Sequence, residues 1–190
     1  QQIRDVDWIK NRYFFIHPWF RNGIDSAIVN NLVIHNVNIP SFYPLVNGFH
    51  YIGNLVVKNF ELYKSINTND AGAVTGTAFI DPLNPTDSLF NDDNETGNFI
   101  RLESGTNYEL SADLGYIRLR DMVMNEILGC SFILEDRNTG QVVLEVGSPA
   151  DSLGTNLSLM MLKPRNSHPN HPSWPLMFKN VYYLGTTQIN

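Results

Sequence analysis

The chain has 190 residues, 43% hydrophobic and 17% charged, which excludes a disordered protein and allows a sizeable buried core. The formal net charge is −6 and no stretch clusters Lys and Arg, so the composition argues against a nucleic-acid-binding protein. Aromatic residues make up 12%, which favours a β-rich core or a stacking surface.

Residues 1–66 predict a mixture of strand and short helix. "FRNGIDSAIVNNL" is compatible with one or two helical turns, and Pro18 either ends a strand or starts that helix. "NLVVKNFELYKSI" predicts a strand over 54–66 with a mainly buried face. The residues of one parity on that face are Val56, Phe60, Leu62 and Ile66.

Residues 67–98 are rich in Gly, Pro, Asn and Asp, so this region predicts long loops around one short strand, "AVTGTAFI". Residues 99–147 have a clearer pattern, in which short polar turns separate apolar runs. "ESGT", "SADLG" and "DRNTG" are such turns, and the last has a glycine suited to positive φ. Short connections join antiparallel neighbours, so we expect a meander here.

Beyond residue 147, "TNLSLMMLKP" and "WPLMFKNVYYLG" predict two further strands, separated by the Pro-rich loop "RNSHPNHPS". The total is about eight or nine short strands, a number typical of sandwiches. The sequence therefore predicts a mostly β, antiparallel sandwich-like fold. We expect one β-rich domain over 1–190, with one or two short helices near the N-terminus.

Few residues are candidates for chemistry. Cys130 lies in the apolar run "ILGCSFIL", without the helix start or basic neighbour that activates a thiolate, so we expect it to be buried and unreactive. In the loop "FNDDNETG", residues 92–95 (Asp92, Asp93, Asn94 and Glu95) carry side-chain oxygens of the kind that bind calcium. The loop lacks the alternating spacing and central glycine of an EF-hand calcium loop. A polar turn is the alternative, and the sequence leaves a calcium site open.

The histidines and tryptophans give no complete site. His168 and His171 lie three residues apart, but two further zinc ligands are missing from the pattern. The remaining residues considered are His17, His35 and His50, and the possible sugar-stacking residues Trp8, Trp19 and Trp174. No nucleophile motif or phosphate-binding glycine loop occurs. We therefore predict no catalytic, cofactor-binding or metal-binding residue, no cofactor and no enzymatic activity, and no metal needed for folding.

Several sequence segments, in this order along the chain, resemble segments of a known protein family. They are "RYFFIHPWFRNGIDSA", "NLVVKNFELY", "GNFIRLESGTNYELSADLGYIRLRD", "NEILGCSFIL", "QVVLEVG", "LMMLKP" and "WPLMFKNVYYLG". In this order, from Arg12 to Gly185, they resemble the recurring non-barrel segments of the SprA/Sov family. These are very large outer-membrane proteins of Bacteroidetes that act in gliding motility and type IX protein secretion. The chain departs from the family in its much shorter length and in "CSFIL", where a more aromatic strand is expected.

The resemblance implies an excised soluble domain of a cell-surface translocon in the outer membrane, on its periplasmic or cell-surface side. Its expected partners are other parts of the translocon and secreted cargo proteins, and no residue of a binding site can be carried over. The alternative function is a carbohydrate-binding β-sandwich module, which the aromatic content and the acidic loop favour.

Overall fold

The structure is a computed structural model, and it describes residues 9–18, 20, 55–67, 71–86, 91–149, 157–179 and 181–183. These residues contain nine β-strands and two short 3-10 helices. The strands are β1 (Tyr13–Phe15), β2 (Leu55–Ile66), β3 (Val74–Phe79), β4 (Glu95–Leu102), β5 (Tyr108–Ser111), β6 (Tyr116–Leu119), β7 (Leu128–Asp136), β8 (Val142–Val146) and β9 (Leu157–Lys163). The helices are η2 (Asn91–Asp93) and η3 (Trp174–Leu176). The predicted mostly β fold class is confirmed.

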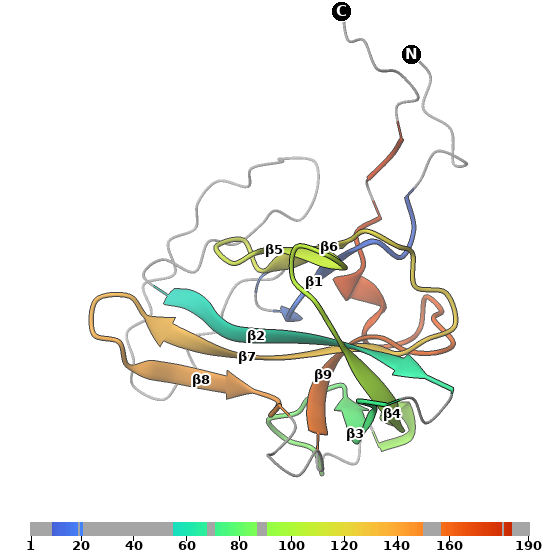
Figure 1. Cartoon of the computed structure of the whole chain (residues 1–190), viewed down its shortest axis with the longest axis horizontal. Coiled ribbons are helices and arrows are strands. Elements are labelled where there is room, and N and C mark those ends of the chain that lie inside the picture. Colours follow the sequence, from blue (N-terminus) through green and yellow to red (C-terminus); the bar gives the residue numbers. More distant parts are fainter. Residues whose placement is uncertain are drawn as a thin grey trace, which may run out of the picture.

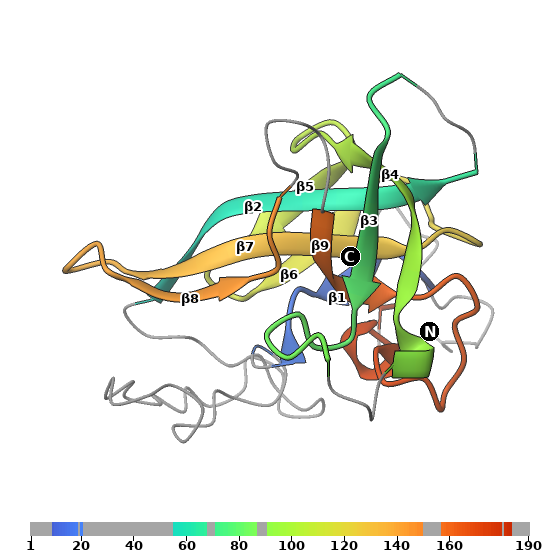
Figure 2. The same ribbon diagram turned by 90° about the horizontal axis from the view of Figure 1, so that it is seen from below.

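The strands form two sheets (Figure 1). The small sheet has the order β1-β6-β5, and the large sheet has the order β2-β4-β3-β9-β7-β8. Because β2 also pairs with β7, five strands of the large sheet close on themselves and β8 extends from them as an outer strand. The β3–β9 pair is parallel, as a closed ring of five strands requires, since five directions cannot alternate all the way round. Figure 2 shows β3, β4 and β9 running across β2 and β7.

The pairing of β2 with β7 contains a β-bulge. Lys58 pairs with Ile133 and Glu61 with Ser131, so β2 has one residue more than β7 between these two pairs. Asn59, inside the bulge, has φ +49°, and Asn tolerates this left-handed conformation better than most residues. An extra residue moves the following side chains to the opposite face, because side chains alternate along a strand.

The bulge explains why the predicted buried parity of β2 is only partly right. Val57, before the bulge, and Leu62, after it, belong to the same core although their numbers differ in parity. Tyr63 and Ser65 are also buried, on the opposite face. Both faces of this strand are therefore covered.

The closed sheet holds the smaller core. Its members come from β2, β3, β4 and β9 and from the turn before β7, and the strand registers place them on one face. They are Tyr63, Ala78, Phe99, Ile127, Leu157, Leu159 and Met161. Space inside so small a sheet is limited: a Cβ on Gly76 would lie 2.5 Å from both the Cβ and the carbonyl oxygen of Leu157.

The larger core lies between the outer face of β2 and β7 and the small sheet. From β7 it includes Cys130, Phe132 and Leu134, all at most 2% exposed. From the small sheet it includes Phe14 and Ile117, both 0% exposed. The predicted burial of Cys130 is confirmed, and the sandwich-like packing arises from these two layers.

The predicted meander is correct only in parts. Two antiparallel hairpins occur within 99–147, β5–β6 and β7–β8, and Gly140 in the second turn has φ +69° as expected. However, β4 pairs with β2 and β3 and not with β5, so the turn at 103–106 leads from one sheet to the other. Across this turn, the N–H of Asn107 donates to the carbonyl oxygen of Glu103, and the N–H of Glu103 donates to Asn107 Oδ1.

The described residues of "WPLMFKNVYYLG" form no strand: the segment begins with η3, because Pro175 lacks an N–H and fixes φ. The strand expected within the loop region 67–98 is present as β3, but the region also contains the start of β4 at Glu95. Pro18 and Phe20 are helical, and the rest of the expected N-terminal helix lies outside the described residues.

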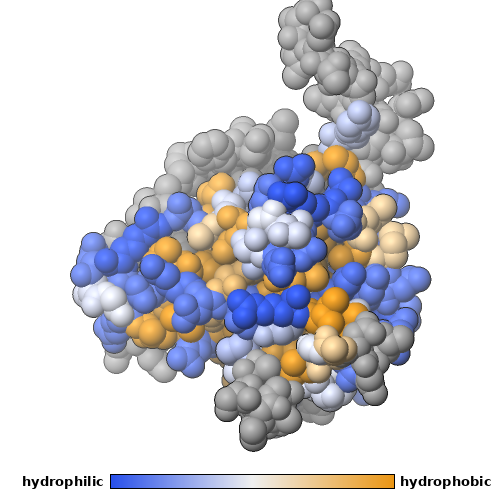
Figure 3. Space-filling view, in the orientation of Figure 1, coloured by the Kyte–Doolittle hydropathy of each residue, from blue (hydrophilic) through white to orange (hydrophobic). Residues whose placement is uncertain are grey.

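On the face shown in Figure 3, apolar residues lie in several patches separated by polar ones. Exposed large apolar side chains among the described residues include Met122 and Met124, in the turn between β6 and β7, and Val142 on β8. Apolar residues scattered in this way are normal for a protein surface.

We predict that Gly76→Ala lowers the free energy of unfolding by about 1–3 kcal/mol, because the new methyl group overlaps Leu157. Gly97 is a matched control, since it pairs with Gly76 across β3 and β4 and its Cβ would have no neighbour closer than 3.8 Å. Gly97→Ala is expected to change the free energy by less than about 0.5 kcal/mol. Urea unfolding of the two variants tests this; equal effects would contradict the packing described.

Candidate functional site

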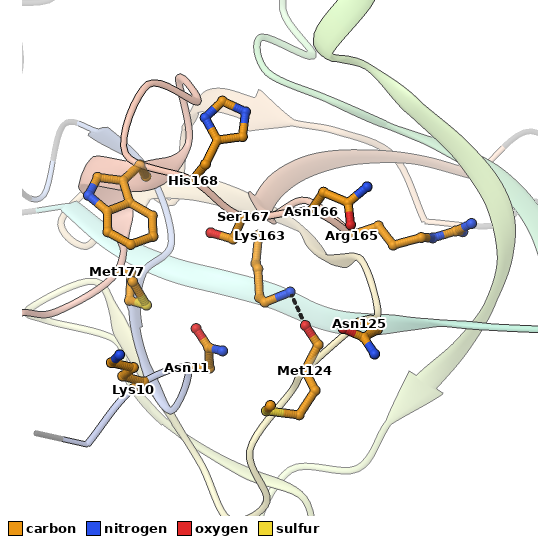
Figure 4. A pocket seen from close by; sticks show the side chains of 11 residues that line it. Lys10, Asn11, Met124, Asn125, Lys163, Arg165, Asn166, Ser167, His168 and Met177 are labelled. Atoms are coloured by element: carbon orange, nitrogen blue, oxygen red, sulfur yellow. Dashed lines mark hydrogen bonds between the residues drawn. The ribbon is translucent and has the colours of Figure 1, made fainter. Parts of the chain in front are cut away.

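A pocket of about 420 Å³ lies where three chain segments meet (Figure 4). The segments are residues 10–11 before β1, residues 124–125 before β7, and the stretch from the end of β9 to η3 and Met177. Its lining residues are Lys10, Asn11, Met124, Asn125, Lys163, Arg165, Asn166, Ser167, His168, Trp174 and Met177. Three of them are lysine or arginine and none is aspartate or glutamate.

Lys163 is fixed beside the pocket by backbone carbonyls. Its side chain is almost completely buried, and Nζ donates to the carbonyl oxygens of Met124 (2.8 Å), Pro164 (2.9 Å) and Glu126 (3.2 Å). Three acceptors match the three protons of an ammonium group. Burial lowers the pKa of Lys163, and the carboxylates of Glu126 and Glu95 oppose that effect. Lys163 thus ties the turn before β7 to the end of β9.

Arg165 and Trp174 add two other kinds of contact. The Arg165 side chain is exposed, and within the described residues its guanidinium forms no ion pair. Trp174 is partly buried, and Nζ of Lys179 lies 5.1 Å from the centre of its ring. The same Nζ donates to the carbonyl oxygen of Trp174 at 2.8 Å, which orders this corner of the chain.

The acidic loop 92–95 does not form an oxygen cluster. Asn94 Oδ1 accepts the N–H of Ile80 at 3.0 Å, and Glu95 Oε1 accepts the N–H of Arg165 at 2.9 Å. Asp93 lies instead next to His171, with 3.9 Å between Oδ1 and Nε2. The oxygens therefore face different neighbours and connect this loop to β3 and to the Pro-rich loop. The two loops that the sequence singled out separately are thus in contact.

His171 and Ser173 form a local contact within the Pro-rich loop. Both side chains are buried, and His171 Nδ1 lies 2.9 Å from Ser173 Oγ and accepts the Ser173 N–H at 3.2 Å. Burial lowers the pKa of His171, and Asp93 opposes the shift. With Asp93, the order of groups is that of a Ser–His–Asp triad. However, Ser173 is only 3% exposed and directly precedes η3, so a substrate has no access to its hydroxyl.

His168 lies 5.7 Å from His171 between ring centres and lines the pocket. In the part of the chain that the structure describes, no three His, Cys, Asp or Glu side chains lie together as a metal site would need. That no metal is required for folding stays a prediction. His35, His50, Trp8 and Trp19 lie outside the described residues.

Cys130 and His17 lie in the larger core. Burial raises the pKa of the Cys130 thiol, whose Sγ donates to the carbonyl oxygen of Ile16 at 3.6 Å. His17 packs edge-on against Phe132 with 6.4 Å between ring centres, and burial lowers its pKa to about 3. Because of these shifts, both side chains are neutral at pH 7.

The pocket was not predicted from the sequence. Its residues come from three segments that are far apart in the sequence, so no local pattern shows them together. The single signal is the lone lysine that ends the mainly apolar β9, "LSLMMLK", because a charged side chain in a buried strand needs a partner.

No model of a protein family matches the sequence, and no curated protein matches it significantly. Among the helices that the structure describes, none has the length and apolar character to cross a membrane.

We predict that Lys163→Met lowers the free energy of unfolding by about 3 kcal/mol, because it leaves three carbonyl oxygens without their donor. Lys58→Met, at an exposed position on β2, is the control and should change it by less than about 0.5 kcal/mol. Denaturant titration gives both values. An unchanged stability of Lys163→Met would show that the three hydrogen bonds contribute nothing.

We further predict that stability falls with acidification through His17. In the folded protein its pKa is about 3, below the ordinary 6.5, so between these values the unfolded chain binds a proton that the folded protein does not. The stabilisation is complete above pH 6.5 and decreases by about 1.4 kcal/mol for each pH unit below it. His17→Gln should remove most of this slope between pH 6 and 5, and the exposed His168→Gln should not. Equal slopes in the two variants would contradict the assignment.

Proposed function

We propose that this chain is a non-catalytic structural and interaction domain of a cell-surface translocon, one that acts in gliding motility and type IX protein secretion in Bacteroidetes. It contacts other parts of the translocon and the secreted cargo, on the periplasmic or cell-surface side of the outer membrane. The observation that supports the proposal most is the ordered set of sequence segments that resemble the SprA/Sov family.

The position of those sequence segments in the fold also supports the proposal. Six of them contain strands: "RYFFIHPWFRNGIDSA" contains β1, "NLVVKNFELY" most of β2, the long central segment β4 to β6, "NEILGCSFIL" most of β7, "QVVLEVG" β8 and "LMMLKP" most of β9. They supply most of both cores. The resemblance thus concerns the framework of the domain, which is what two copies of one structural module would share.

The burial of the potentially reactive side chains agrees with a domain that works by binding other proteins. Cys130 and Ser173 are buried, and His171 is engaged by Ser173 within its own loop. The two ends of the described chain also meet, because the N–H of Ile9 donates to the carbonyl oxygen of Val181 at 2.8 Å. A longer chain can therefore enter and leave the module at one place, as insertion of a domain requires.

The same backbone contact defines the test. In the parent protein, residues 10–180 are replaced by a short Gly-Ser linker, which spans the Ile9–Val181 contact without strain. We expect normal amounts of the parent protein in the outer membrane, with reduced secretion of type IX cargo and reduced recovery of other translocon subunits with it. Unchanged secretion and unchanged subunit recovery would contradict the proposal.

The rival function is a carbohydrate-binding module, and the pocket beside Trp174 favours it. Saturable binding of a defined glycan, together with normal secretion by the deletion variant, would establish that rival.

A further inference from the structure

We propose that the pocket between residues 10–11, 124–125 and 163–177 binds a carboxylate-bearing sugar residue, such as a uronic acid in an acidic oligosaccharide. The proposal deepens the rival carbohydrate-binding function and does not depend on the translocon assignment.

The charge of the lining indicates an anionic ligand. In a chain of net charge −6, the pocket is lined by Lys10, Lys163 and Arg165 and by no carboxylate. The two carboxylates that act on Lys163 both accept a backbone N–H: Glu126 Oε2 accepts that of Met124 at 2.9 Å, and Glu95 Oε1 accepts that of Arg165. An anion entering here meets cationic groups first.

The cations have different roles. The Lys163 ammonium has all three of its protons engaged by carbonyl oxygens, so it contributes a fixed charge and no further hydrogen bond. The Arg165 guanidinium forms no ion pair within the described residues, and its planar pair of N–H groups suits a carboxylate. Arg165 is therefore the group that we expect to contact the ligand's charge.

The neutral lining indicates a hydroxyl-rich ligand. Asn11, Asn125 and Asn166 each offer a donor and an acceptor, and Ser167 adds a hydroxyl. Trp174 provides a flat apolar surface against which the C–H face of a sugar ring can pack. The volume of about 420 Å³ lies at the small end of the ~300–1,000 Å³ found for ligand pockets.

A peptide ligand fits less well. Extended peptides are bound by adding a strand to a free sheet edge, and main-chain hydrogen bonds then supply the affinity. This pocket is lined mainly by loop residues and side-chain amides, with Lys163 at the very end of β9 as its strand residue.

The test uses the full chain and calorimetric titration with a short oligogalacturonate and its neutral methyl ester. We expect the acid to bind and the ester to bind at least about tenfold more weakly, as loss of a charged hydrogen bond predicts. Arg165→Gln should weaken acid binding about tenfold, while Lys58→Gln, an exposed cation on β2, should leave it unchanged.

Glu95→Gln is the reciprocal variant. Its amide oxygen can still accept the N–H of Arg165, but the negative charge near the pocket is removed, so acid binding should tighten about two- to fivefold. Failure of the acid to bind, equal binding of the ester, or no effect of Arg165→Gln in a variant with an unchanged melting temperature would overturn the proposal. Tighter binding of polyglutamate than of oligogalacturonate would also overturn it, in favour of an acidic peptide.

Discussion

The pairing of β2 with β7 is the constraint on which the rest of the structure depends. This antiparallel pair closes the five-stranded part of the large sheet, and its outer face carries the small sheet. The bulge at Asn59 lets one strand serve both purposes, since it places Val57 and Leu62 in the larger core while Tyr63 enters the smaller one. Without this change of face, one of the two cores would lose its share of β2.

The pocket is a product of the same framework. Its three segments carry no regular strand of their own apart from the end of β9, and they are held by bonds that run back to the sheets. Lys163 joins β9 to the turn before β7, and Ser65 Oγ accepts the N–H of Ile127 in that same turn at 2.8 Å. On the opposite side, Glu95 at the start of β4 holds the backbone of Arg165. A cationic pocket held by hydrogen bonds to a β-framework suits recognition by contact, which both the translocon proposal and the acidic-sugar proposal require.

The sequence predicted the strands better than their partners. Alternation and turn residues located β2, β3, β7, β8 and β9, because each of these depends on local spacing. The exchange of partners after β4 was missed, since a polar turn such as "ESGT" looks the same whether it joins paired strands or leads to another sheet. The burial of Cys130 followed from its apolar neighbours, but the burial of Lys163 and Ser173 depends on partners far along the chain or on loop geometry that no pattern encodes. The acidic and Pro-rich loops were both recognised as unusual, and their contact with one another was not.

Hydrogen exchange of the native protein, followed residue by residue by NMR, tests the central role of the β2–β7 pair most directly. The amides of residues 62–65 and 128–134, which lie between two cores, should exchange most slowly and should report the free energy of global unfolding. Those of the small sheet should exchange faster, through openings that leave the closed sheet intact. If the slowest amides lie in β5 and β6 while β2 and β7 open locally, the β2–β7 pair is not the foundation of the fold.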